Sequence, residues 1–175
     1  MQYCFTTNFE LLEVSKLISP WLLALLVYKV WHFQKEKEVV ANEAKDILKI
    51  IDDLKSSYTT VYIHYHLYFK SNVHFDSNEF EKSKNENHKI EKDFISKIDF
   101  LLALIKDKKL NRIYNSFKLN EAKFSATQII YEDGDIKILD DLKIITDWLE
   151  KDLDNFKLEL VKYAMYKNKV YYKSA

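Results

Sequence analysis

Glycine and proline are nearly absent from this chain, with one residue of each, Gly134 and Pro20, among 175. Tight turns, β-bulges and hairpins usually recruit glycine, whereas long helices need neither residue. The scarcity therefore predicts an all-α fold. It also excludes several classes of enzyme, because the chain has no GxxxxGK[ST], GxGxxG or GxSxG motif for nucleotide binding or acyl transfer.

Cysteine and arginine are equally scarce. Cys4 is the only cysteine, so no internal disulfide can form, which suits a reducing compartment. Arg112 is the only arginine, and 27 basic and 27 acidic residues give a formal net charge of zero. The chain lacks both a bulk positive field and the guanidinium forks that bind phosphate and guanine, so we expect no nucleic-acid partner.

What the chain does have is one apolar run near its N-terminus, residues 17–33, with the sequence LISPWLLALLVYKVWHF. Crossing a bilayer takes roughly 20 residues, a length that residues 11–33 reach if Glu13, Lys16 and Lys29 are included. Lys29 can carry its ammonium to the headgroups at one end, and Glu13 can pair with Lys16 at the other. Residues 1–33 are therefore predicted to be an N-terminal segment and membrane anchor. The residues expected to form the anchor are Pro20, Trp21, Leu22, Leu23, Leu25, Leu26, Tyr28, Lys29 and Trp31.

The same run leaves other interpretations open. Ser19 and Pro20 are typical either of a helix start at the membrane interface or of a kink inside a longer span. An apolar run of this length can also be the core helix of a wholly soluble bundle. A cleaved signal peptide is disfavoured, because bulky Trp31 and the charged sequence QKEKE follow the run.

The distribution of lysines predicts the orientation of the anchor. Only Lys16 precedes the apolar core, whereas Lys29, Lys35, Lys37 and Lys45 follow it. Basic residues collect on the cytoplasmic side of a membrane. We therefore expect a single-pass protein of the cell inner membrane, with residues 34–175 in the cytoplasm.

Apolar residues recur at helical spacing through residues 34–175, which predicts an antiparallel bundle of about four helices. The first helix should continue from the anchor without a break, and its expected core positions are Val40, Ala44, Ile47, Ile51, Leu54 and Tyr58. Residues 58–69, YTTVYIHYHLYF, also suit a strand by propensity, but one aromatic face continues through them, so we favour helix. A polar loop over residues 70–78 should follow, with Asp76 capping the second helix.

The later helices differ in clarity. The second is polar at first and then apolar, at Phe94, Ile98, Leu101, Leu102 and Ile105. The pattern weakens over residues 111–132, which suggests one or two shorter helices through Ile113, Phe117 and Phe124. A turn around Gly134, with Asp135 as a cap, leads to the clearest amphipathic helix, whose apolar residues seven apart are Leu142, Leu149, Phe156 and Tyr163.

Aromatic residues gather over residues 58–69 and form a candidate binding surface. They are Tyr58, Tyr62, Tyr65, Tyr68 and Phe69. Such residues at helical spacing usually pack in a core, but the tyrosine hydroxyl suits an interface, so a partner surface or a groove for a small planar ligand is the second interpretation.

Histidines and paired aspartates raise the alternative of a metal-dependent enzyme in the bundle. On a helix His64 and His66 point away from each other, although His74 and His88 could join them after folding, and no HExxH, ExxH or CxxC pattern supports a site. The aspartate pairs alternate with lysine at helical spacing and are expected on solvated faces. These pairs are Asp52 and Asp53, Asp140 and Asp141, and Asp152 and Asp154. We expect no metal, no cofactor and no catalytic residue.

The stretch WHFQKEKEVVANEAK resembles the juxtamembrane helix of a loose group of small bacterial membrane proteins that have one N-terminal span and a helical cytoplasmic domain. The resemblance covers residues 21–55. It implies a mobile-element or phage-defence context and carries over no catalytic residues. Together with the patterns above, it predicts a non-enzymatic, membrane-anchored interaction or effector protein that binds a protein partner or self-associates.

Overall fold

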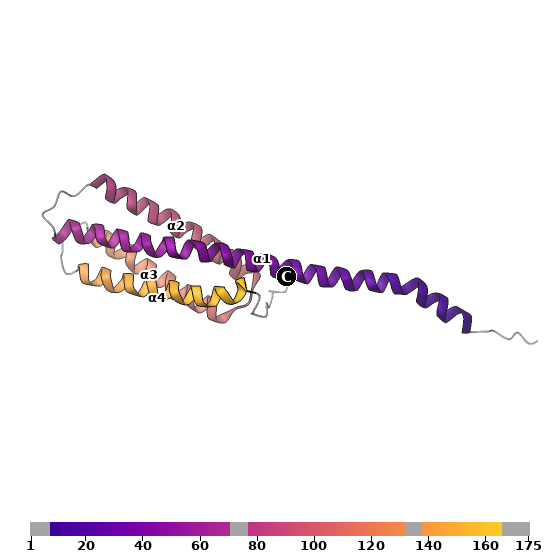
Figure 1. The fold of residues 1–175 in the computed structure, drawn as a ribbon. Helices are drawn as coiled ribbons and strands as arrows, with labels where there is room; N and C mark the ends of the chain where they lie inside the picture. The colour runs from indigo at the N-terminus through magenta and orange to yellow at the C-terminus, as the bar shows by residue number, and fades with distance from the viewer. Residues whose placement is uncertain (1–7, 71–76, 132–137, 166–175) are drawn as a thin grey trace, which may run out of the picture. The chain divides into compact units, whose positions relative to one another are not determined.

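The computed structural model describes residues 8–70, 77–131 and 138–165, and the regular elements in these ranges are all helices (Figure 1). The four helices are α1 (Asn8–Lys70), α2 (Ser77–Leu104), α3 (Lys108–Tyr131) and α4 (Ile138–Ala164). The all-α prediction is therefore confirmed for the described residues.

α1 is one helix of 63 residues, and it contains both the apolar run and the aromatic stretch. The expectation of an unbroken continuation is confirmed, and residues 58–69 are helical rather than extended. The helix nevertheless passes from one compact unit, Met1–Val39, into a second, Val40–Ala175. The first unit contains the candidate anchor, and the second contains the hydrophobic core.

The core of the second unit is built from one face of each helix. All six predicted core positions of α1, from Val40 to Tyr58, are buried, as are the five in and just after α2, from Phe94 to Ile105. In α4 the residues seven apart, from Leu142 to Tyr163, are buried as well. Burial of these apolar side chains supplies most of the free energy that holds the helices together.

Three phenylalanines meet at the centre of this core. The rings of Phe94 (α2) and Phe117 (α3) lie 5.2 Å apart, and Phe94 lies 5.4 Å from Phe156 (α4) in a T-shaped arrangement. Tyr58 of α1 packs edge to face on Phe124, with 5.1 Å between ring centroids. Such pairs contribute about 0.5–1.5 kcal/mol each beyond area burial. All four helices thus contribute aromatic rings to the core.

The connection from α2 to α3 is made by residues 105–107 and uses an aspartate instead of glycine. The Asp107 carboxylate accepts hydrogen bonds from the backbone N–H groups of Lys109 (2.8 Å) and Leu110 (3.0 Å). This is the geometry of a helix N-cap. The residues from Lys108 to Tyr131 then form a single helix, so the weak pattern over residues 111–132 corresponds to one element.

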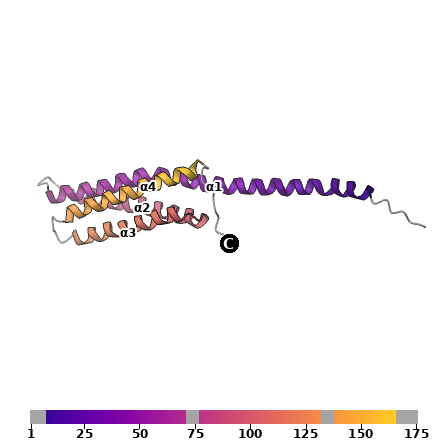
Figure 2. The same ribbon diagram turned by 90° about the horizontal axis from the view of Figure 1, so that it is seen from below.

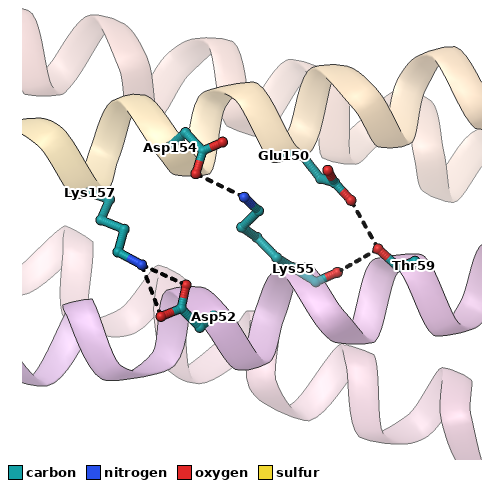
Figure 3. A network of polar contacts seen from close by, with 6 residues as sticks. All are labelled: Asp52, Lys55, Thr59, Glu150, Asp154 and Lys157. Atoms are coloured by element: carbon teal, nitrogen blue, oxygen red, sulfur yellow. Dashed lines mark hydrogen bonds and ion pairs between the residues drawn. The ribbon is translucent and has the colours of Figure 1, made fainter.

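Polar contacts join α1 to α4 along one side of the second unit (Figure 3). Lys157 Nζ donates to both carboxylate oxygens of Asp52, at 2.8 and 3.0 Å, and Lys55 Nζ donates to Asp154 at 2.8 Å. The Thr59 hydroxyl donates to Glu150 at 2.9 Å. As the α1 residue number rises from Asp52 to Thr59, the number of its partner in α4 falls from Lys157 to Glu150.

Several sequence predictions fall outside the described residues. They are the caps at Asp76 and Asp135, the turn at Gly134, and any role of Cys4 or His74.

Candidate functional site

The most exposed apolar surface in the first unit belongs to residues 17–33 of α1. Every side chain of this stretch is exposed, and Trp21 and Leu17 are 73% and 74% accessible. The predicted anchor residues, from Pro20 to Trp31, share this exposure. Contiguous apolar surface of this kind marks a membrane-binding or protein-binding region in proteins generally.

By length and composition, α1 is the one helix among the described residues that could cross a membrane. The most apolar stretch of the helix has no buried residue, unlike the core helix of a soluble protein. The structure therefore gives no support to the interpretation in which residues 17–33 form the core of a soluble bundle.

Pro20 lies inside α1, which begins twelve residues earlier at Asn8. Ser19 and Pro20 therefore do not start the helix, and Pro20 lies within it. Proline removes one backbone hydrogen bond from a helix interior, a defect that membrane helices tolerate.

The candidate tyrosine surface is divided between core and solvent. Tyr58 and Tyr65 are buried, Tyr62 and Phe69 are partly buried against the core, and Tyr68 is exposed. The two buried tyrosines therefore serve the core, which was the first of the two interpretations. Of the residues that remain accessible, Tyr68 and Phe69 are in ring contact, with 4.8 Å between centroids.

A buried polar cluster lies where α1, α2 and α3 meet. The Tyr58 hydroxyl donates to Glu91 Oε2 at 3.3 Å, and the Asn87 amide donates to the Ser57 hydroxyl at 2.8 Å. Glu91 is only 8% accessible and is also hydrogen-bonded to Glu121 of α3. The sequence patterns did not indicate this cluster, because its members come from three separate helices.

The environment of Glu91 changes its protonation. Burial and the nearby Glu121 carboxylate raise the pKa of Glu91 to about 7, although the hydrogen bond from Tyr58 opposes the shift. Burial and the two carboxylates also raise the pKa of Tyr58 well above its ordinary value. Glu91 can therefore keep its proton up to near neutral pH.

A pocket of about 330 Å³ opens beside this cluster between α2 and α3. Its lining side chains are polar or charged and include Lys84, His88, Glu91, Ser125 and Gln128. Sites for small organic ligands are mostly apolar with a few polar groups. The composition of this pocket therefore does not identify an organic ligand or a catalytic centre.

One aspartate expected in solvent is buried, so that prediction is wrong. Asp152 is 8% accessible, and its carboxylate accepts hydrogen bonds from Ser116 (3.0 and 3.1 Å) and from the Asn120 amide (2.8 Å). Two polar groups on α3 meet it, which compensates for its removal from water. Asp52, Asp53, Asp140, Asp141 and Asp154 are exposed as expected.

His64, His66 and His88, considered as metal ligands, lie in different surroundings on α1 and α2. His64 lies beside the Phe80 ring, with 6.0 Å between centroids, and His66 lies 6.2 Å from the Tyr62 ring. His88 is exposed on α2. Within residues 8–70, 77–131 and 138–165, no three His, Cys, Asp or Glu side chains gather as a metal site.

Comparison with protein-family models, with curated proteins and with solved structures finds no match for this chain.

Proposed function

We propose that this protein is a membrane-anchored helical bundle that acts by binding a protein partner or a second copy of itself and performs no chemistry of its own. A span within residues 11–33 crosses the inner membrane once, and the second unit lies in the cytoplasm. The observation that carries the proposal is the complete exposure of an apolar stretch long enough to span a bilayer.

The second unit is, in this proposal, an antiparallel four-helix bundle. The contacts of Asp52 with Lys157 and of Lys55 with Asp154 support it, because they run in opposite directions along α1 and α4. A bundle with a filled core and polar contacts between helices offers a rigid surface for recognition. The phage-defence context is supported by the sequence resemblance alone.

The orientation in the proposal depends on the charges that flank the span. Lys16 precedes it, while Lys29, Lys35, Lys37 and Lys45 lie at or after its end. Exposed lysines next to a span favour the cytoplasmic side. Lys29 can also reach a neighbouring span or water if several copies associate within the membrane.

Cell fractionation tests the anchor and its orientation together. The full chain, tagged at its C-terminus, should remain in membranes after a carbonate wash, and the tag should be protected from protease in intact spheroplasts. Leu25→Arg places a charge at the span centre at a cost of about 3 kcal/mol and should lower the share of the chain retained in washed membranes. Leu119→Arg, which changes an exposed leucine of α3, should not. Recovery of the unaltered chain in the soluble fraction would refute the anchor.

A further inference from the structure

A concentration of basic residues lies at the connection between α2 and α3. Residues 106–112, KDKKLNR, contain four basic side chains and one acidic side chain. The side chains of Lys106, Lys108, Lys109 and Arg112 are all exposed. We call these four residues the basic end.

The acidic groups closest to these residues are already engaged. The Asp107 carboxylate accepts the Tyr163 hydroxyl and two backbone N–H groups of α3, and Glu159 pairs with Lys109 and Lys162. Among the described residues, Lys106, Lys108 and Arg112 have no ion-pair partner within 4 Å. The basic end therefore presents at least three uncompensated positive charges to solvent.

The basic end lies at the same end of the second unit as Val40, where the chain enters from the first unit. Moving along α1 from Thr59 to Asp52, toward Val40, the partners in α4 move from Glu150 to Lys157, toward its C-terminus. That end of α4 holds Tyr163, which contacts Asp107. Both views show α4 ending, and α2 passing into α3, at this end (Figures 1 and 2).

Chain length keeps this end close to the bilayer. Six residues lie between Phe33, the last of the apolar run, and Val40, so seven residue steps join them. Seven residues span about 10 Å as a helix and at most about 25 Å when extended. The end of the second unit at Val40 therefore lies at most about 25 Å along the chain from Phe33, so a short reorientation can bring its charges within the Debye length of about 8 Å from the headgroups.

The opposite end of the second unit has the opposite charge. Residues 140–150, at the start of α4, contain four acidic residues and one lysine. Asp140, Asp141 and Asp147 are exposed. The second unit thus has a positive end at Val40, where the chain enters it, and a negative end opposite, although the whole chain has no net charge.

We propose that the basic end binds the anionic headgroups of the phospholipids around the anchor and so holds the second unit upright on the membrane surface. This inference rests on the proposed function, because the anchor brings the basic end to the lipid. Attraction between basic residues and an anionic leaflet strengthens membrane contact about fivefold for each residue close to the surface. Three free charges should therefore shift the equilibrium between contact and detachment by about 100-fold.

Energy transfer to labelled lipid tests the contact in the full chain. Cys4→Ser removes the native thiol, and a fluorescent donor is attached to Asn111→Cys at the basic end or to Lys143→Cys at the acidic end. The chain is reconstituted in vesicles with a headgroup acceptor, made of phosphatidylcholine alone or with added phosphatidylglycerol. Transfer from position 111 should rise with the anionic lipid and fall again at high salt, whereas transfer from position 143 should not rise.

A matched pair of variants separates local charge from total charge. Lys106→Gln, Lys108→Gln and Arg112→Gln together should abolish the rise in transfer, whereas Lys82→Gln, Lys89→Gln and Lys143→Gln, with the same change of net charge, should leave it in place. Circular dichroism checks that both variants keep their helices.

The outcomes distinguish this inference from the anchor proposal. Equal energy transfer in the two kinds of vesicle, from a chain that floats with both, would overturn the lipid contact. The basic end would then be a candidate binding site for an acidic protein surface. Flotation only with anionic vesicles, reversed by salt, would support the lipid contact and overturn the anchor. A chain that floats with neither kind would refute both.

Discussion

Glu91→Gln should make the second unit less sensitive to pH. Glu91 is buried between α1 and α3, and the titratable groups that face it are Tyr58 and Glu121. Burial and the Glu121 carboxylate raise its pKa from 4.5 to about 7. Glutamine has the same shape, can still accept the Tyr58 hydroxyl and can donate to Glu121, but it does not titrate.

The size and direction of the effect follow from the two pKa values. Between pH 4.5 and about 7 the folded protein retains a proton on Glu91 that the unfolded chain releases. The free energy of unfolding therefore falls as the pH rises through this window. One pKa unit corresponds to about 1.4 kcal/mol, so the loss between pH 5 and pH 8 is about 2–3 kcal/mol.

Urea unfolding of the full chain in detergent, followed by circular dichroism, measures this difference. The unaltered chain should lose about 2–3 kcal/mol more than the Glu91→Gln variant between pH 5 and pH 8. Glu86→Gln removes an exposed carboxylate from the same helix and should keep the pH dependence of the unaltered chain. If Glu91→Gln and the unaltered chain lost the same stability across this range, the conclusion that buried Glu91 keeps its proton up to near neutral pH would be wrong.

Three further substitutions test the packing and the polar contacts, each by urea unfolding at pH 7. Phe156→Ala removes one of three packed phenylalanine rings and should lower the free energy of unfolding by about 3–5 kcal/mol. Leu158→Ala, at a 66% exposed position, should lower it by less than about 0.5 kcal/mol. Asp107→Ala removes the N-cap of α3 and should cost about 1–2 kcal/mol, with Asp107→Asn recovering most of it. Asp152→Ala leaves the two donors of α3 unsatisfied and should lower the free energy of unfolding by about 2 kcal/mol. Asp154→Ala removes an exposed ion pair and should lower it by less than about 1 kcal/mol. Equal losses for the two variants would contradict the buried network around Asp152.

Periodicity in the sequence predicted much of the fold, because burial of apolar surface is the main driving force for folding and leaves a local pattern in the chain. Apolar residues three and four apart identified the buried faces of α1 and α4. The near absence of glycine and proline correctly predicted helices, including residues 58–69, where β-branched and aromatic residues alone favour a strand. In that stretch, tertiary packing of Tyr58, Val61 and Tyr65 in the core outweighs local propensity.

The connection between α2 and α3 was not predicted, although a local sequence pattern for it exists. Ile105 was expected to continue the core of the second helix, and it is buried, but the helix ends at Leu104. The sequence Asp107-Lys-Lys-Leu110 is an N-cap followed by helix-forming residues, a local pattern that identifies the start of α3.

The buried acids could not be predicted, because their burial depends on partners that lie far away in the sequence. Asp152 and Asp154 differ by two positions on one helix, and both lie among lysines. Asp152 is buried against Ser116 and Asn120, whereas Asp154 stays exposed and contacts Lys55. Only the rotation of α4 about its axis separates the two environments, and that rotation is fixed by the packing of Leu149, Leu153 and Phe156.

These polar contacts have a consequence for which helices lie next to each other. The apolar faces of four amphipathic helices can pack in more than one order with similar burial, because the hydrophobic effect is not directional. In another order Asp152 would lose its donors on α3, and Glu91 would lose Tyr58 and Glu121. An unsatisfied buried group costs about 1–3 kcal/mol, which is a large fraction of the stability of a small domain. The two clusters therefore favour the observed neighbours over alternatives that bury the same apolar surface.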